Sequence, residues 1–244
     1  MIEVNGLTRL YGDRVAVRNL SFRVAAGEIV GLVGPNGAGK TTTLRCLTGI
    51  LRPTSGTIQI AGHQLLTEPL PAKRALAFVP DEPALFEQLT VEEHLQLIGR
   101  IYSVPVGEPQ LAQILGELEL VDRRHAFPAE LSRGMKQKLA IACALVHRPT
   151  VLLLDEPLTG LDPLAIRRMK QTILASAAGG AAVLLSSHLL PLVEQLCSRV
   201  LILRQGDIVA DGTVAALLAR ATGPGSRTLE DAFISLMDPG SPSA

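Results

Sequence analysis

The stretch GLVGPNGAGKTTTL, residues 31–44, joins an apolar run typical of a buried strand to a run typical of a helix. Its centre, Gly34 to Thr41, matches the pattern G-x-x-x-x-G-K-[ST] in full. Glycines allow successive backbone N–H groups to point into one concavity, at the positive end of the helix that follows. The stretch therefore predicts a binding site for the phosphates of a nucleotide.

The positions of this loop have different expected tasks. We expect Lys40 to reach the β- and γ-phosphates as a compact positive charge, Thr41 to complete the shell of a Mg²⁺ ion, and Thr42 to reach the α-phosphate. An ordinary glycine-rich turn is the alternative, which the full match and its position between strand and helix disfavour. The predicted phosphate-binding residues are Gly34, Pro35, Asn36, Gly37, Ala38, Gly39, Lys40, Thr41 and Thr42.

Two carboxylates follow a second apolar run, VLLL at residues 151–154. In open α/β sheets, ligands bind beyond the carboxyl ends of the strands. We expect Asp155 to hold Mg²⁺ through water and Glu156 to accept a proton from an attacking water molecule. The alternative is a strand that ends in two solvated acids, and the phosphate loop upstream argues against it.

The composition disfavours several classes of protein. The 244 residues contain 23 Lys and Arg against 23 Asp and Glu, and a net charge of zero is unusual for a nucleic-acid-binding protein. We find no run of about eighteen uncharged apolar residues that would span a membrane and no secretory signal at the N-terminus. The three cysteines are far apart and fit core positions in a reducing compartment.

The remaining pattern alternates strands and helices around one helical interruption. Helices are expected over residues 41–51 and from about Pro163, and helical spacing dominates from Thr90 to about His147. This pattern predicts an α/β core interrupted by an all-helical lobe, with a short C-terminal appendage. The expected strands lie within residues 1–33, 54–62, 75–80, 151–155, 181–188 and 199–213.

The segment LSRGM, residues 131–135, begins one of the lobe helices, with Ser132 as its expected N-cap. Alone, it would be a capped amphipathic helix. Because it shortly precedes VLLLDEP and follows the phosphate loop, the chain resembles the ABC ATPases, the nucleotide-binding subunits of ABC transporters. The resemblance extends from Ile2 to about Met237, and the form LSxGMKQ is similar to the ATPases of type-2 ABC exporters.

The resemblance implies an α/β fold: a P-loop NTPase core with an N-terminal antiparallel β subdomain and an inserted all-helical subdomain. It implies a single ABC ATPase domain over residues 1–220, in which 1–80 and 149–220 form the core and 81–148 form the helical lobe. Residues 221–244 are then a short C-terminal tail.

The resemblance also assigns tasks to residues outside the phosphate loop. Tyr11 lies where the family stacks an aromatic ring on adenine, although a core tyrosine is the alternative. His188 matches a histidine that contacts the γ-phosphate. Ser132, Gly134 and Asp162 match residues that face the nucleotide of a second subunit, and Asp162 also fits the start of a helix.

The sequence departs from the family pattern in two motifs. The family has a glutamine after the strand that leads into the lobe, where this chain has Asp81. A carboxylate there can still hold Mg²⁺, directly or through water, or Asp81 is only a turn residue before Pro83. In the signature, Arg133 and Met135 replace the family's residues.

The implied function is to bind and hydrolyse ATP, with Mg²⁺, between two head-to-tail subunits. Closure of this homodimer, or dimer with a paralogous subunit, would drive transport, with export favoured, by a separate polytopic permease. The groove after Asp81, with Phe86 and Leu89, would receive the permease at the cytoplasmic face of the cell membrane. The alternatives are a non-transport ABC ATPase acting in translation or DNA repair, and a small-molecule kinase.

Overall fold

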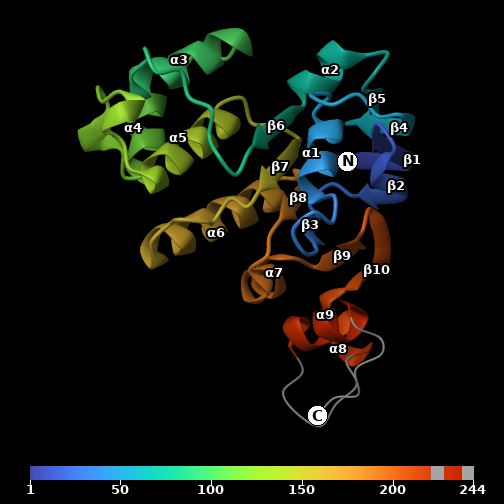
Figure 1. The fold of residues 1–244 in the computed structure, drawn as a ribbon. Coiled ribbons are helices and arrows are strands. Elements are labelled where there is room, and N and C mark those ends of the chain that lie inside the picture. The colour runs from blue at the N-terminus through green and yellow to red at the C-terminus, as the bar shows by residue number, and fades with distance from the viewer. Residues whose placement is uncertain (221–227, 238–244) are drawn as a thin grey trace.

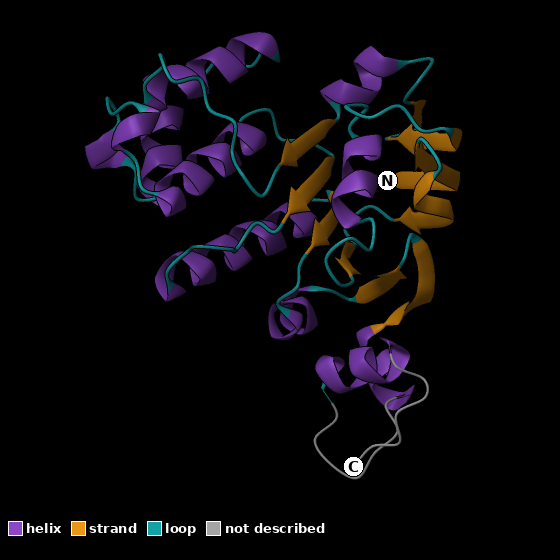
Figure 2. Cartoon of the chain, in the orientation of Figure 1, coloured by secondary structure: helices purple, strands orange, loops and turns teal. Residues whose placement is uncertain are grey.

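A computed structural model of the chain describes residues 1–220 and 228–237 (Figure 1). Two sheets form one side of the molecule, a group of helices projects from them as a lobe, and a pair of helices lies near the C-terminus (Figure 2). Of the predicted C-terminal tail, residues 221–227 and 238–244 lie outside the described residues. The α/β fold with an inserted helical part is confirmed.

The smaller sheet is antiparallel throughout and has the strand order β2-β1-β4-β5. Apolar residues alternate along its strands, so that Ile2 and Val4 of one strand lie buried beside Ile60 and Ile58 of its neighbour. This sheet confirms the predicted N-terminal antiparallel subdomain. Its strands are β1 (Ile2–Tyr11), β2 (Arg14–Val24), β4 (Ser55–Ile60) and β5 (His63–Gln64).

The larger sheet has the order β10-β9-β3-β8-β7-β6 and is parallel except for the hairpin of its last two strands in the chain. Every residue of β3, β7 and β8 is buried, because helices and the smaller sheet cover both faces. The strands are β3 (Ile29–Val33), β6 (Leu76–Val79), β7 (Val151–Asp155), β8 (Ala182–Ser186), β9 (Arg199–Arg204) and β10 (Asp207–Thr213).

Alternate residues of the larger sheet face two separate apolar clusters. Leu152 and Leu154 pack with the lobe, while Val151 and Leu153 pack toward the smaller sheet. Since β7, β8 and β3 are parallel neighbours, their carboxyl ends meet at one edge of the sheet. The loops after residues 33, 155 and 186 are therefore brought together, as the sequence pattern predicts.

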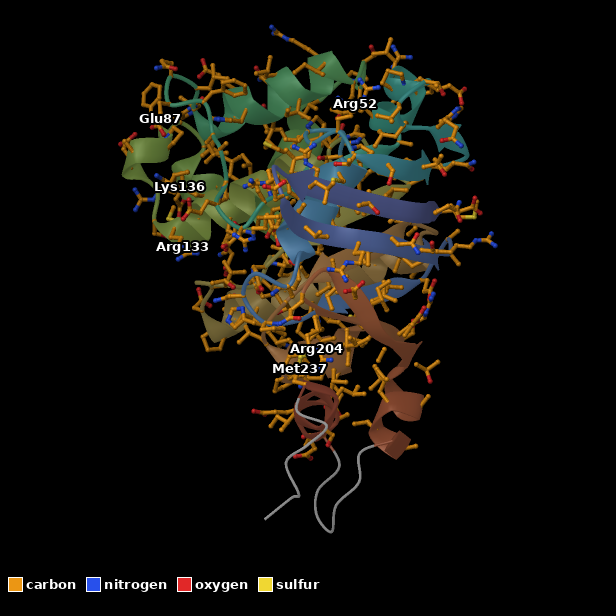
Figure 3. The ribbon with its side chains drawn as sticks, turned by 45° about the vertical axis from the view of Figure 1, so that its right-hand side comes forward. Arg52, Glu87, Arg133, Lys136, Arg204 and Met237 are labelled. Carbon is orange, nitrogen blue, oxygen red and sulfur yellow. The ribbon has the colours of Figure 1, made fainter. Side chains whose placement is uncertain are left out.

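The core helices include several that the sequence pattern did not predict. The first helix ends at Leu47 rather than near residue 51, because Gly49 follows with φ +71° and stops the helix. Arg204 donates to the carbonyl of Met237 at 3.2 Å and so holds the last helix against the sheet (Figure 3). These helices are α1 (Lys40–Leu47), α2 (Pro69–Arg74), α6 (Pro163–Ala178), α7 (Leu190–Leu196), α8 (Val214–Arg220) and α9 (Leu229–Met237).

The helical lobe lies at the left of Figure 1, beside β6 and β7. Thr90 begins its first helix with a capping box, in which its hydroxyl accepts from the backbone N–H of Glu93 and the Glu93 carboxylate accepts from that of Thr90. The lobe is joined to the core where α5 packs against β6. Its helices are α3 (Val91–Ile101), α4 (Glu108–Glu117) and α5 (Arg133–Leu145), with short 3₁₀ turns at Val121–Arg123 and Pro128–Glu130.

Candidate active site

A cavity of about 380 Å³ opens at the carboxyl edge of the larger sheet. It collects residues of the phosphate loop, the two acids that follow β7 and the acid that follows β6. These segments are distant in sequence, and most of the residues predicted for the site line this one cavity. Its lining residues are Tyr11, Arg14, Ala16, Asn36, Gly37, Ala38, Gly39, Lys40, Thr41, Thr42, Asp81, Asp155 and Glu156.

The backbone of the phosphate loop requires glycine where α1 begins. Gly39 has φ +108°, and a Cβ atom there would lie 2.6 Å from the carbonyl oxygen of Ala16. Any side chain at this position would both strain the backbone and collide with another backbone. The first turn of α1 has no acidic residue, so its N–H groups, which lack partners within the helix, lie at a positive terminus.

Lys40 is the buried cation of the cavity, with 8% of its surface exposed. Its Nζ donates to the carbonyl oxygen of Gly34 at 2.6 Å and to that of Pro35 at 3.4 Å. Burial lowers the pKa of Lys40, and the nearby Glu156 and Asp155 partly oppose this change. Gly34 and Pro35 therefore contact the lysine through their carbonyl oxygens and are not among the residues that line the cavity.

Asp155 is fixed by a serine that the sequence pattern did not identify. Strand pairing places Asp155 opposite Ser186, and the Ser186 hydroxyl donates to Asp155 Oδ1. Both residues are buried. The only sequence signal was the serine at the end of the strand 181–188, and its partner became evident only with the strand register.

Glu156 has a strained backbone and a specific partner. Its φ is +50°, and its N–H donates to the Ser186 carbonyl oxygen at 3.1 Å. Its Oε2 lies 2.9 Å from Nδ1 of His188 and also accepts from the His188 backbone N–H at 3.3 Å. Such strain at a site residue is typical of functional positions. His188 contacts Glu156 but is not among the residues that line the cavity.

The cavity has the oxygen groups that a Mg²⁺ ion requires. Thr41, Asp81 and Asp155 all line it, and hydroxyl and carboxylate oxygens suit this hard cation. In residues 1–220 and 228–237 there is no group of three or more His, Cys, Asp or Glu arranged to hold a metal. Hydroxyl and carboxylate oxygens of this kind fit a Mg²⁺ ion that takes further ligands from phosphates and water.

Tyr11 lies at the rim of the cavity, and the alternative of a core tyrosine is wrong, because 46% of its surface is exposed. The guanidinium of Arg9 lies 4.8 Å from the centre of its ring. Arg14 and Ala16 also line the cavity, and the sequence reasoning missed them. They follow Tyr11 across the tight turn between β1 and β2, so their proximity to it was the available signal.

Ser132, Gly134 and Asp162 do not line this cavity. The Ser132 hydroxyl accepts from the N–H of Met135 at 3.3 Å, which confirms that it is the N-cap of α5. Asp162 caps α6 by accepting from the N–H of Ala165 at 2.9 Å, and this bond holds the pKa of Asp162 below its usual value. Within a single chain these three residues thus stand apart from the site.

Comparisons with known proteins agree with this geometry. A model of the family described as ABC transporter matches residues 17–159. The ABC-type transporter ATP-binding protein EcsA of Bacillus subtilis (strain 168) is 37% identical, and the match covers 97% of this chain and 96% of EcsA. Other curated relatives include the Nod factor export ATP-binding protein I of Paraburkholderia xenovorans (strain LB400), 38% identical over 91% of this chain and 74% of that protein.

Solved structures share the fold. One, described as the ATP-binding subunit of an ABC transporter, is 37% identical, has a TM-score of 0.91, and covers 97% of this chain and 99% of its own. Another, described as a dimeric bacterial ABC transporter cassette, is 25% identical, has a TM-score of 0.79, and covers 87% of this chain and 98% of its own. Among the described helices of the present chain, none has the length and apolar character needed to cross a membrane.

Proposed function

Because this chain belongs to the ABC transporter family and is an ATP-binding and ATP-hydrolysing subunit, we propose the following roles for its residues in binding and hydrolysing ATP. One observation carries the proposal: a single cavity contains the phosphate loop, Asp155 and Glu156. The phosphates of ATP bind to the N–H groups at the start of α1, and Lys40 turns from its two carbonyl partners to the terminal phosphates. The adenine ring stacks on Tyr11, whose exposed face is available for it.

Thr41, Asp81 and Asp155 hold a Mg²⁺ ion beside the phosphates. When bound, the ion supplies positive charge that offsets the negative charge of the triphosphate. The Ser186 hydroxyl keeps Asp155 turned toward this position. The carboxylate of Asp155 is the best fixed of the three groups, because it is buried and hydrogen bonded.

Glu156 acts as the general base. Its carboxylate accepts a proton from a water molecule while the water oxygen forms a bond to the γ-phosphorus and the bond to the bridging oxygen breaks, which yields ADP and phosphate. His188 orients the Glu156 carboxylate through the contact at 2.9 Å and approaches the γ-phosphate once ATP is bound. Proton transfer of this kind accelerates reactions by about 10²- to 10⁴-fold.

The second half of the site comes from another subunit. Ser132 and Gly134, at the start of α5, and Asp162, at the start of α6, lie outside the cavity of their own chain. In a head-to-tail dimer they face the γ-phosphate held by the partner, where the positive end of α5 favours an anion. The description of a related bacterial cassette as dimeric supports the pairing of two such subunits. ATP then holds two subunits together, and hydrolysis lets them separate.

A polytopic membrane permease receives this motion, and the chain works at the cytoplasmic face of the membrane. An apolar groove of about 220 Å³ lies between the loop after β6 and helices α3 and α5. Phe86 lines the groove and has 55% of its surface exposed. Leu85 also lines the groove, whereas Leu89, which the sequence predicted there, is not among the lining residues. A short apolar segment of the permease fits this groove. Export is the proposed direction, since curated relatives include export proteins.

Copurification from detergent-solubilised membranes tests the assignment to a transporter. The wild-type chain should retain a polytopic membrane protein, and Phe86→Asp should reduce its yield at least severalfold without loss of ATP binding. Phe127→Asp is the matched control, because Phe127 is also exposed on the lobe but does not line the groove. Recovery of ribosomes or DNA in place of a membrane protein would support the non-transport alternative.

A further inference from the structure

The two motifs in which this sequence departs from the family pattern contact each other. Nη2 of Arg133 lies 3.4 Å from Oδ1 of Asp81, although 52 positions separate the residues. Asp81 lines the nucleotide cavity, whereas Arg133 is the first residue of α5 and does not. The ion pair thus connects the wall of the cavity to the helix that begins at the signature segment.

The Arg133 side chain follows a defined path although it is largely exposed. A Cβ atom at Gly160 would lie 3.3 Å from Arg133 Cδ and 3.4 Å from its Nε. The side chain therefore runs along the backbone of the loop between β7 and α6 before it reaches Asp81. Lys136, one turn further along α5, is the nearest comparable cation on the same helix (Figure 3).

Three carboxylates line the cavity in which the polyphosphate would bind. Asp81, Asp155 and Glu156 all line it, with Lys40 and Arg14 as the lining cations. An unneutralised carboxylate beside a polyphosphate repels it. Of these acids, Asp81 forms an ion pair with Arg133, which does not itself line the cavity. The distance of 3.4 Å between Arg133 Nη2 and Asp81 Oδ1 is one at which opposite charges attract.

We propose that Arg133 neutralises Asp81 and thereby strengthens nucleotide binding in the cavity of its own subunit. The inference rests on the proposed function, because it takes this cavity as the nucleotide site. It gives the start of α5 two tasks. Ser132 serves the nucleotide of the partner, and Arg133 acts through Asp81 on the nucleotide of its own chain.

Binding of ADP in the presence of EDTA tests this role, because neither a metal ion nor a dimer is then required. In isothermal titration calorimetry, Arg133→Gln should weaken ADP binding about two- to fivefold, the range expected for one exposed ion pair. Arg133→Lys should retain most of the affinity. In the Asp81→Asn background, Arg133→Gln should have no effect, so the double-mutant cycle assigns the loss to this pair.

Lys136→Gln removes the same charge from the same helix and should leave ADP affinity unchanged, and raised salt should shrink the effect of Arg133→Gln. Equal affinities of the wild type and Arg133→Gln, or a loss that persists with Asp81→Asn, would overturn the inference. Failure of the wild-type protein to bind ADP would instead contradict the proposed function. Because Arg133 is exposed, circular dichroism of each variant should match the wild type.

Discussion

Replacing Ser186 by alanine should destabilise the protein more than its small change in volume suggests. The hydroxyl is fully buried and donates to the buried carboxylate of Asp155. The N–H of Glu156, which also contacts this hydroxyl at 3.2 Å, retains the Ser186 carbonyl oxygen as a partner. Only the bond to the carboxylate is therefore lost without replacement. A hydrogen bond to a charged group contributes about 1.5–3 kcal/mol, and we expect Ser186→Ala to lower the free energy of unfolding by that amount.

Differential scanning calorimetry measures the effect, with urea unfolding as a second assay. For a chain of this length, about 1 kcal/mol shifts Tm by about 2–4 °C, so Ser186→Ala should lower Tm by about 3–12 °C. Ser187→Ala is the control, because Ser187 is also buried and its hydroxyl, among the described residues, accepts from the uncharged N–H of Leu189 and has no charged partner. Such a neutral bond contributes about 0.5–1.5 kcal/mol. Equal losses in the two variants would refute the reasoning about the carboxylate.

Two further substitutions test the charged residues of the site. Lys40→Met should lose ATP binding in calorimetry. Burial lowers the pKa of Lys40, so the folded wild type releases this proton at a lower pH than the unfolded chain. The stability of the wild type in urea relative to Lys40→Met should therefore rise as the pH approaches the ordinary lysine pKa of 10.5, and a constant or falling difference would contradict this. His188→Asn should bind ATP with nearly wild-type affinity but hydrolyse it at least tenfold more slowly, because the Glu156 carboxylate loses its contact with the imidazole ring. An unchanged turnover rate would show that His188 has no part in the mechanism.

The sequence predicted those parts of the site that are formed by residues close to one another in the chain. The phosphate loop, from Gly34 to Thr42, is a local pattern in which glycines, lysine and a helix start act together, and the structure places it against the two acids after β7. The strands were also predictable, because short continuous apolar runs bounded by turn residues are typical of buried strands. The cap at Ser132 followed in the same way from its position before a helical pattern.

The sequence could not predict contacts that depend on strand register or on the path of long side chains. Ser186 faces Asp155 only because β7 and β8 pair in one register. The approach of Arg133 to Asp81 depends on the packing of the lobe against the core. Helices such as α2 and α7 have only six and seven residues, too few for a clear periodic pattern.

The central claim is that ATP is enclosed between two copies of this chain, with Ser132 of one facing the phosphates held by the other. Analytical gel filtration of Glu156→Gln, whose amide cannot accept the proton, measures this directly. With ATP and Mg²⁺ the variant should elute as a dimer, without ATP as a monomer, and with Lys40→Met added it should remain a monomer. Elution of Glu156→Gln as a monomer with saturating ATP bound would contradict the account.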